Sequence, residues 1–167
     1  MSFIPSGSQT VGPFFNFGLT TDARLGRIEG EGERIRVEFH VTDGEGSPTP
    51  GDSMVELWQA DGAGQYGPHG FARLETDPEG KCMFETIRPG RVGDAAQHIN
   101  VIVFARGLLK HLHTRLYFEG EPLNATDAVL NSVPAARRST LVATLVDGVW
   151  RMPIRLQGDG ETVFFDV

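Results

Sequence analysis

The sequence predicts a mainly β protein, an antiparallel two-sheet β-sandwich with one short helix. Two observations support this fold class. Apolar and polar residues alternate over several short stretches, as they do in strands that are buried on one face. Turn residues separate these stretches, including DGEG at 43–46, DPEG at 77–80 and DG at 147–148. Many short strands with glycine-rich turns between them are typical of an antiparallel sandwich.

Each expected element follows from its own pattern. Residues 99–104 form a nearly unbroken apolar run, which predicts a strand buried on both faces. Only residues 134–143 look helical, with Ser132 or Pro134 as the start signal. All the strands that we expect from alternation or from an apolar run lie at residues 35–41, 54–58, 82–87, 99–104, 141–145 and 149–151.

Length and charge narrow the class of protein. A chain of 167 residues lies in the single-domain range and can bury roughly 70% of its unfolded surface, so we treat residues 1–167 as one domain. Its 22 acidic and 15 basic residues give a net charge of −7 without a basic cluster. That balance argues against nucleic acid or an anionic membrane as a partner. No run of about 18 apolar residues is present, so we expect no membrane-spanning helix.

Two further features favour a cytoplasmic protein. The first residues, MSFIP, lack the basic start and apolar core of a secretory signal. The lone Cys82 cannot form an internal disulfide, which fits a reducing compartment.

Residues 88–100, RPGRVGDAAQHIN, have the pattern of a metal site that has lost ligands. Side chains alternate along a strand, so a His-x-His pair would direct two imidazoles to one side. Here His98 takes the first position, but Asn100 takes the second, and an amide is a poor replacement for imidazole. Upstream, Tyr66 follows a glycine-rich turn and offers a phenol oxygen.

Together these segments resemble the intradiol ring-cleaving dioxygenases, in which two tyrosines and two histidines hold a non-haem ferric ion. The resemblance places the family's first tyrosine at Tyr66 and its first histidine at His98. It places the second tyrosine at Val92 and the second histidine at Asn100. Val92 has no donor atom. The resemblance therefore implies a dioxygenase subunit that binds no iron and holds no catalytic residue of its own.

The resemblance runs through the whole chain. Two-subunit members of the family pair an iron-bearing β subunit with a related α subunit whose own site has decayed. Only the loop between Tyr66 and Phe71 and the segment 21–34 are shorter than the family leads us to expect. Segments of the α type occur in order at residues 8–14, 55–61, 104–107, 111–118 and 157–166.

The resemblance implies a subunit that completes its partner's active site. The two-subunit members use O2 to open protocatechuate between its hydroxyl-bearing carbons, and their Fe(III) is expected in the β subunit and not in this chain. This chain would therefore be active only with that β partner. Residues 1–20, which include Phe14, Phe15 and Phe17, would pack on the partner, because aromatic residues are enriched in interfaces. The resulting pairs would assemble into a larger hetero-oligomer.

The same resemblance assigns substrate contacts to four residues. Thr10, Gly12 and Pro13 match α-subunit positions that lie against the β active site. Arg106 matches an arginine at the substrate end of that pocket. The chemistry agrees, because a guanidinium pairs well with a carboxylate such as that of protocatechuate. Gly12 allows close backbone approach, and Pro13 stiffens the segment.

Each of these residues also has a plainer interpretation. A Gly-Pro near a terminus is commonly only a turn, and Arg106 is equally compatible with a solvated residue at a strand end. His98 fits a hydrogen-bonded core or interface histidine. Tyr66 fits a packed side chain whose hydroxyl finds a backbone partner.

Two functional alternatives stay open at this point. His111 and His113 form an intact His-x-His, and with His98 and Glu119 they would make a cupin-like metal site. The glycine-rich run that usually surrounds such paired histidines is missing. The second alternative is a non-catalytic binding module, since β-sandwiches host many functions.

Overall fold

The structure is a computed structural model that describes residues 7–12, 14–44, 47 and 53–167. Within these residues, eight strands form one mixed sheet in the order β3-β2-β5-β6-β7-β8-β1-β4. The strands are β1 (Arg34–Thr42), β2 (Ser53–Trp58), β3 (Phe71–Glu75), β4 (Lys81–Ile87), β5 (His98–Ala105), β6 (Leu112–Phe118), β7 (Val142–Val146) and β8 (Val149–Arg155). The mainly β prediction is confirmed.

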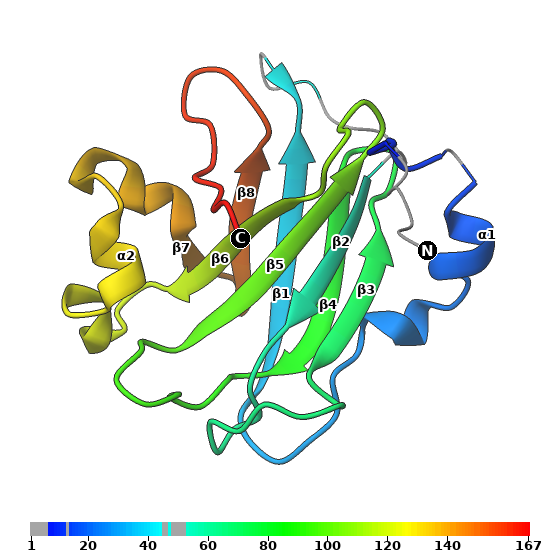
Figure 1. The fold of residues 1–167 in the computed structure, drawn as a ribbon. Coiled ribbons are helices and arrows are strands. Elements are labelled where there is room, and N and C mark those ends of the chain that lie inside the picture. The colour runs from blue at the N-terminus through cyan, green and yellow to red at the C-terminus, as the bar shows by residue number, and fades with distance from the viewer. Residues whose placement is uncertain (1–6, 13, 45–46, 48–52) are drawn as a thin grey trace, which may run out of the picture.

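The expected pair of separate antiparallel sheets is wrong. Strand β1 pairs with β8 in parallel, and β6 pairs with β7 in parallel through two residue pairs, Tyr117 with Val142 and Phe118 with Ala143. The chain leaves β6, crosses through residues 119–141 and returns in the same direction, which makes the pairing with β7 parallel. This short junction joins the two halves, so that the sheet is continuous and curls on itself. In Figure 1, β6, β5, β2 and β3 lie in front of β8 and β1.

The hydrophobic core fills the space inside the curled sheet. Both halves contribute side chains with essentially no exposure, and Phe39 of β1 packs edge-on against Phe84 of β4 with ring centroids 5.9 Å apart. Burial of these apolar side chains is the main force that holds the two halves together. The best-buried core residues on the strands include Val37, Phe39, Phe84, Val55, Leu57, Val101, Val103, Leu116 and Ile154.

The helical segments differ from the expectation. Residues 134–143 do not form an α-helix: the 3-10 helix η4 (Ala135–Leu141) ends where β7 begins. Its tighter winding is visible in the bond from the Arg137 amide to the Pro134 carbonyl, 2.8 Å, three residues back. The other helical segments are α1 (Asn16–Leu19), η1 (Ala23–Gly26), η3 (Pro122–Ala125) and α2 (Ala128–Ser132). No helix in the described ranges is long and apolar enough to cross a membrane.

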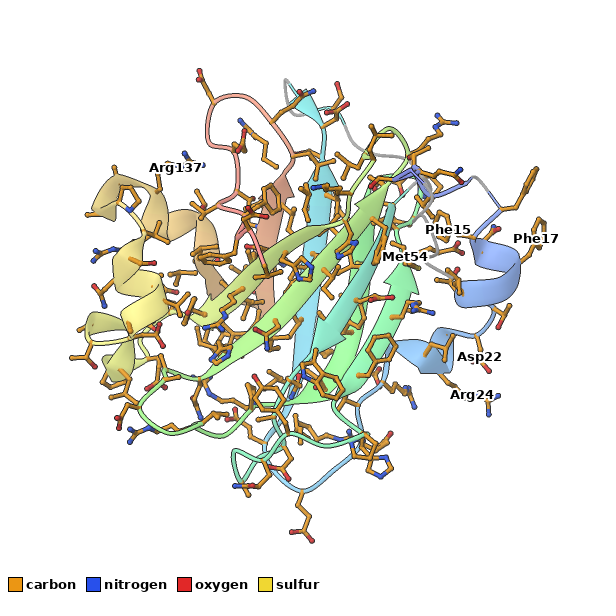
Figure 2. All side chains as sticks on the ribbon, in the orientation of Figure 1. Phe15, Phe17, Asp22, Arg24, Met54 and Arg137 are labelled. Atoms are coloured by element: carbon orange, nitrogen blue, oxygen red, sulfur yellow. The ribbon has the colours of Figure 1, made fainter. Side chains whose placement is uncertain are left out.

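The segment around α1 carries an exposed aromatic pair. Phe14 and Phe17 are 72% and 75% exposed, and their rings stack with centroids 5.8 Å apart. Phe15 is buried instead, and Figure 2 shows it on the side of α1 that faces Met54 of β2, whereas Phe17 points outward. One phenylalanine therefore anchors this segment, and the other two form an apolar surface.

Strand β5 is buried on one face only, which corrects the expectation of burial on both faces. Ile99, Val101 and Val103 face the core, whereas Asn100 and Ile102 on the outer face are half-buried. The outer face of β5 and β6 can therefore present polar side chains. Candidate site residues lie along this face.

Two glycines allow the loop before Tyr66 to pack against the loop after β4. A Cβ atom built on Gly90 would overlap the backbone nitrogen of Gly64. Gly64 itself has a φ of +82°, which favours glycine. The Gly90 amide donates a hydrogen bond to the Asp61 carbonyl at 2.7 Å, so the two backbones are in direct contact.

We predict that Gly90→Ala lowers the free energy of unfolding by about 1–3 kcal/mol, because the added methyl group must displace backbone atoms. Gly67→Ala is the matched control, since a Cβ at Gly67 meets nothing within 4 Å. This control should stay within about 0.5 kcal/mol of the wild type. Urea denaturation followed by circular dichroism measures both. Equal stability of the two variants would mean that the loops can separate without cost.

Candidate functional site

The structure brings Tyr66, His98 and Asn100 together. The Tyr66 hydroxyl lies 3.4 Å from Nε2 of His98 and accepts a hydrogen bond from Nδ2 of Asn100 at 3.0 Å. His98 and Asn100 share the outer face of β5, as their spacing predicts, and Tyr66 arrives from the loop after β2. The Trp58 ring, at the end of β2, stacks on Tyr66 with centroids 5.9 Å apart. We call these residues, with Val92, the vestigial centre.

The protonation of His98 follows from its partners. Its Nδ1 lies 2.8 Å from the Ala96 carbonyl, which can only accept, so Nδ1 carries a proton. Burial lowers the pKa of His98, and the nearby Arg115 guanidinium lowers this pKa further. Neutral His98 therefore keeps a lone pair on Nε2, which can accept the proton of the Tyr66 hydroxyl.

The Asn100 amide has only one orientation that satisfies its neighbours. Nδ2 also donates to the Trp58 carbonyl at 3.1 Å, and Oδ1 accepts from Nε of Arg115 at 3.1 Å. Rotating the amide by half a turn would set an oxygen against the Trp58 carbonyl and an NH2 against Arg115. The NH2 group must therefore face Tyr66, and it has no lone pair for a metal ion.

The vestigial centre does not fit the ferric ion of the family. Val92 is half-buried in the loop after β4 and has no donor atom. Asn100 offers an NH2 group, and Arg115 adds a positive charge beside it. A hard trivalent cation needs anionic oxygen donors, and here one phenol and one imidazole remain. Among the described residues, no group of three or more His, Cys, Asp and Glu is placed to hold a metal.

Sequence reasoning missed the side chains that surround this centre. Arg115 donates from Nη1 to the Tyr117 hydroxyl at 3.4 Å, and that hydroxyl donates to Oδ1 of Asp127 at 3.0 Å. Burial raises the pKa of Tyr117 to about 12, so it stays a neutral phenol. Alternation along β6 could have indicated Arg115 and Tyr117, because they share a face with His113.

Asp127 ties this network to the loop after β4. It accepts hydrogen bonds at 2.8 Å from the amides of Ala96 and Leu130, and the second of these caps α2. Burial alone would raise the pKa of Asp127, but these bonds outweigh it and lower this pKa. A charged Asp127 therefore fixes the loop that precedes His98.

Arg88 holds the other end of the same loop. Its guanidinium lies over the Phe118 ring at 4.4 Å and the Trp150 ring at 5.2 Å. Its Nε donates to Oε1 of Gln97 at 2.8 Å, and Glu121 lies 3.7 Å from Nη2. Each such cation–π contact typically contributes about 0.5–2 kcal/mol. The loop of the vestigial centre is therefore fixed at both ends without a metal.

Thr10 and Arg106 lie together at the opposite end of β5. The Thr10 hydroxyl accepts from the Gly107 amide at 2.8 Å and donates to the Ala105 carbonyl at 3.4 Å. These two backbone groups bracket the exposed Arg106. Seven residues of strand separate Ala105 from His98, which is roughly 23 Å.

Thr10, Gly12 and Arg106 form what we call the N-terminal wall. Gly12 is exposed, and its carbonyl accepts from the Phe15 amide at 3.3 Å. Pro13, the fourth residue assigned to substrate contact, lies outside the described residues. The sequence therefore indicated two separate groups of candidate residues, and in the structure these groups lie at opposite ends of β5.

The cupin-like combination is not assembled. His98 pairs with Tyr117 in the register of β5 and β6, whereas His113 pairs with Ile102, four residues along the strand from His98. Four residues of strand span roughly 13 Å. Glu119 is exposed beyond the end of β6. Only His111 and His113 approach each other, with ring centroids 4.7 Å apart.

Comparison with known proteins identifies the family of this chain. A family model described as Dioxygenase matches residues 18–155. The α chain of protocatechuate 3,4-dioxygenase from Burkholderia cepacia is 42% identical, with 96% of each chain covered. This chain belongs to the intradiol dioxygenase family. The β chain of protocatechuate 3,4-dioxygenase from the same organism is 34% identical over 82% of this chain and 66% of its own length.

A solved structure supports the same family. The dioxygenase domain of a dioxygenase carbohydrate-binding protein fusion from Streptomyces sp. SirexAA-E superposes with a TM-score of 0.68 at 25% identity. That match covers 83% of this chain and 88% of the other. Membership of the intradiol dioxygenases removes the alternative of an unrelated β-sandwich binding module.

We predict a pH dependence of stability that originates at His98. Its pKa is lowered in the folded chain, so below about pH 6.5 the unfolded chain takes up a proton that the folded chain does not. The free energy of unfolding should fall from that pH down to the folded pKa, by at most about 1.4 kcal/mol per pH unit. Below the folded pKa this contribution should level off.

Urea denaturation at several pH values between 7.5 and 5 measures how the free energy of unfolding changes. The His98→Gln variant should show a smaller fall than the wild type, because it has no imidazole at this position. Identical pH profiles for the two proteins would assign the dependence to other groups.

Proposed function

We propose that this chain is the α subunit of a protocatechuate 3,4-dioxygenase. The enzyme would cleave protocatechuate between its hydroxyl-bearing carbons with O2, giving 3-carboxy-cis,cis-muconate in the β-ketoadipate pathway. The observation that carries the proposal is the 42% identity to the Burkholderia cepacia α chain over nearly the whole length of both chains. The β chain from that organism is less similar, at 34%.

In this proposal the Fe(III) belongs to the β subunit. The vestigial centre keeps Tyr66 and His98, but Val92 has no donor atom, Asn100 donates a hydrogen bond to Tyr66, and Arg115 adds a positive charge beside Asn100. Loss of a single residue that supports a ligand typically lowers metal affinity about 10–100-fold. Loss of two direct ligands should lower it further, so this chain contributes no catalytic residue by itself.

The chain would contribute the N-terminal wall to the partner's substrate pocket. The Thr10 hydroxyl fixes the N-terminal segment to the turn that carries Arg106, so that segment and guanidinium are presented together. A guanidinium in a partly dry cleft binds a carboxylate strongly, and protocatechuate carries one. Pro13 would continue this wall.

The N-terminal segment of the single domain would also hold the partner. We propose that residues 1–20 pack on the β subunit through the apolar surface of Phe14 and Phe17. Exposed aromatic pairs of this kind are typical of interface cores. The αβ pairs would then assemble into a larger symmetric particle. A cytoplasmic location stays a prediction from the lone Cys82, which is buried and unbridged.

Purification with and without the β subunit from the same genome tests the function. The chain alone should carry far less than one iron per chain and should not consume O2 with protocatechuate. Co-expressed with the β subunit, it should co-purify in equal amounts and give an active enzyme. One iron per chain together with turnover by the isolated chain would overturn the proposal.

A double variant, Phe14→Ser with Phe17→Ser, probes the contact in the same assay. Both rings are exposed, so the variant should fold but co-purify poorly with the β subunit. Leu145→Ser is the matched control, because Leu145 is 53% exposed on β7, which lies on the side of the molecule opposite α1 (Figure 1). Full co-purification of the double variant would exclude this surface as the main contact.

Arg106→Ala, in the assembled enzyme, should raise the KM for protocatechuate roughly 10–150-fold. This range corresponds to the loss of a charge-assisted pair of about 1.5–3 kcal/mol. The KM for catechol, which has no carboxylate, should change much less, and the iron content should stay normal.

Arg91→Ala is the control, because Arg91 is an exposed arginine in the loop of the vestigial centre. It should leave both constants near their wild-type values. An equal rise for both substrates in Arg106→Ala would assign a structural role to Arg106.

A further inference from the structure

The His111–His113 pair is a sequence motif that the proposed function does not use. His113 lies on the outer face of β6, and His111 is two residues earlier, just before that strand begins. Their rings approach to 4.7 Å between centroids, with planes at 65°. Within the described part of the chain, neither imidazole takes part in a hydrogen bond. Their ring nitrogens therefore remain available to a ligand.

The ring separation suits a shared metal ion. If each imidazole nitrogen binds at about 2.0–2.1 Å and each ring centre lies about 1.1 Å behind it, ligand angles of 90–110° separate the centres by roughly 4.5–5.2 Å. The observed 4.7 Å falls inside this range. Rotation of each ring about its side-chain bonds would bring a nitrogen of both imidazoles to one ion, and the backbone need not move.

The surroundings limit the pair to a small set of conformations. His113 is half-buried on β6, and the Phe104 ring contacts His111 with centroids 5.2 Å apart. A side chain that is held on a rigid strand, as His113 is, loses little entropy when it binds a ligand. No third His, Cys, Asp or Glu joins the pair in the described residues, so water would complete the coordination.

We propose that His111 and His113 form a two-histidine site for a divalent transition metal ion that prefers imidazole, such as Zn2+ or Cu2+. Mg2+ and Ca2+ prefer oxygen donors and would not bind. His111 also lines a small pocket with Gln9 and Val11, which flank Thr10. A bound ion would therefore lie beside the N-terminal wall. This inference does not depend on the proposed function of the wall.

Isothermal titration of Zn2+ into the full-length chain at pH 7.5 tests the site. One ion should bind with a Kd of roughly 1–100 μM, about 5.5–8 kcal/mol of binding free energy. His111→Gln and His113→Gln should each weaken binding at least tenfold, because a single remaining imidazole is a weak ligand. His69→Gln is the matched control, an exposed histidine in the loop before β3, and should bind as the wild type does.

Cu2+ electron paramagnetic resonance gives a second readout that a folding defect does not mimic. The wild-type spectrum should show coupling to two imidazole nitrogens, and each variant should show coupling to one at most. Circular dichroism confirms that the variants fold. A wild-type Kd for Zn2+ above about 1 mM, or unchanged binding in both histidine variants, would overturn the proposal.

Discussion

The antiparallel register of β5 on β6 is the constraint on which both candidate regions depend. It sets His98 opposite Tyr117 and Asn100 opposite Arg115, and it leaves His113 opposite Ile102. A shift by one residue would turn every one of these side chains to the other face. The core face, buried around Val101 and Leu116, resists such a shift. Packing on the inner face therefore determines the chemistry on the outer face.

Hydrogen bonds at the vestigial centre connect separate segments of the chain, as a bound metal ion does in a metalloprotein. The Asn100 amide connects the loop of Tyr66, the end of β2 and the Arg115 side chain of β6. A coordinated ion would join a similar number of segments through its ligands. Because each donor meets an acceptor, the centre avoids the cost of unsatisfied buried groups. The loop after β4, fixed by Arg88, keeps its order for the same reason.

The alternation of apolar and polar residues predicted several strands, because it reflects the burial of neighbouring residues in the sequence. Alternation located β1 and β4 within one residue, because each has one buried face, and it located β2 equally well although nearly all of that strand is buried. It missed β3 and β6, and it could not indicate the parallel junction of Tyr117 with Val142, which depends on where the crossover returns. At the site, spacing brought His98 and Asn100 together correctly. Arg115 and the buried Asp127 escaped notice, because their partners come from neighbouring strands and loops that a single sequence does not align.

The guanidinium of Arg115 beside Asn100 would oppose the return of a metal ion to the vestigial centre in evolution. Beside a trivalent cation, a fixed positive charge a few ångströms away is repelled strongly in a partly dry site. Restoring the missing donor side chains would still leave that charge in place, and removing Arg115 first would leave Oδ1 of Asn100 without its donor. Each single substitution toward a metal site would therefore be unfavourable until all of them had been made. If this chain is the α subunit proposed above, its dependence on an iron-bearing partner would be hard to undo, and the two chains would be retained together as one enzyme.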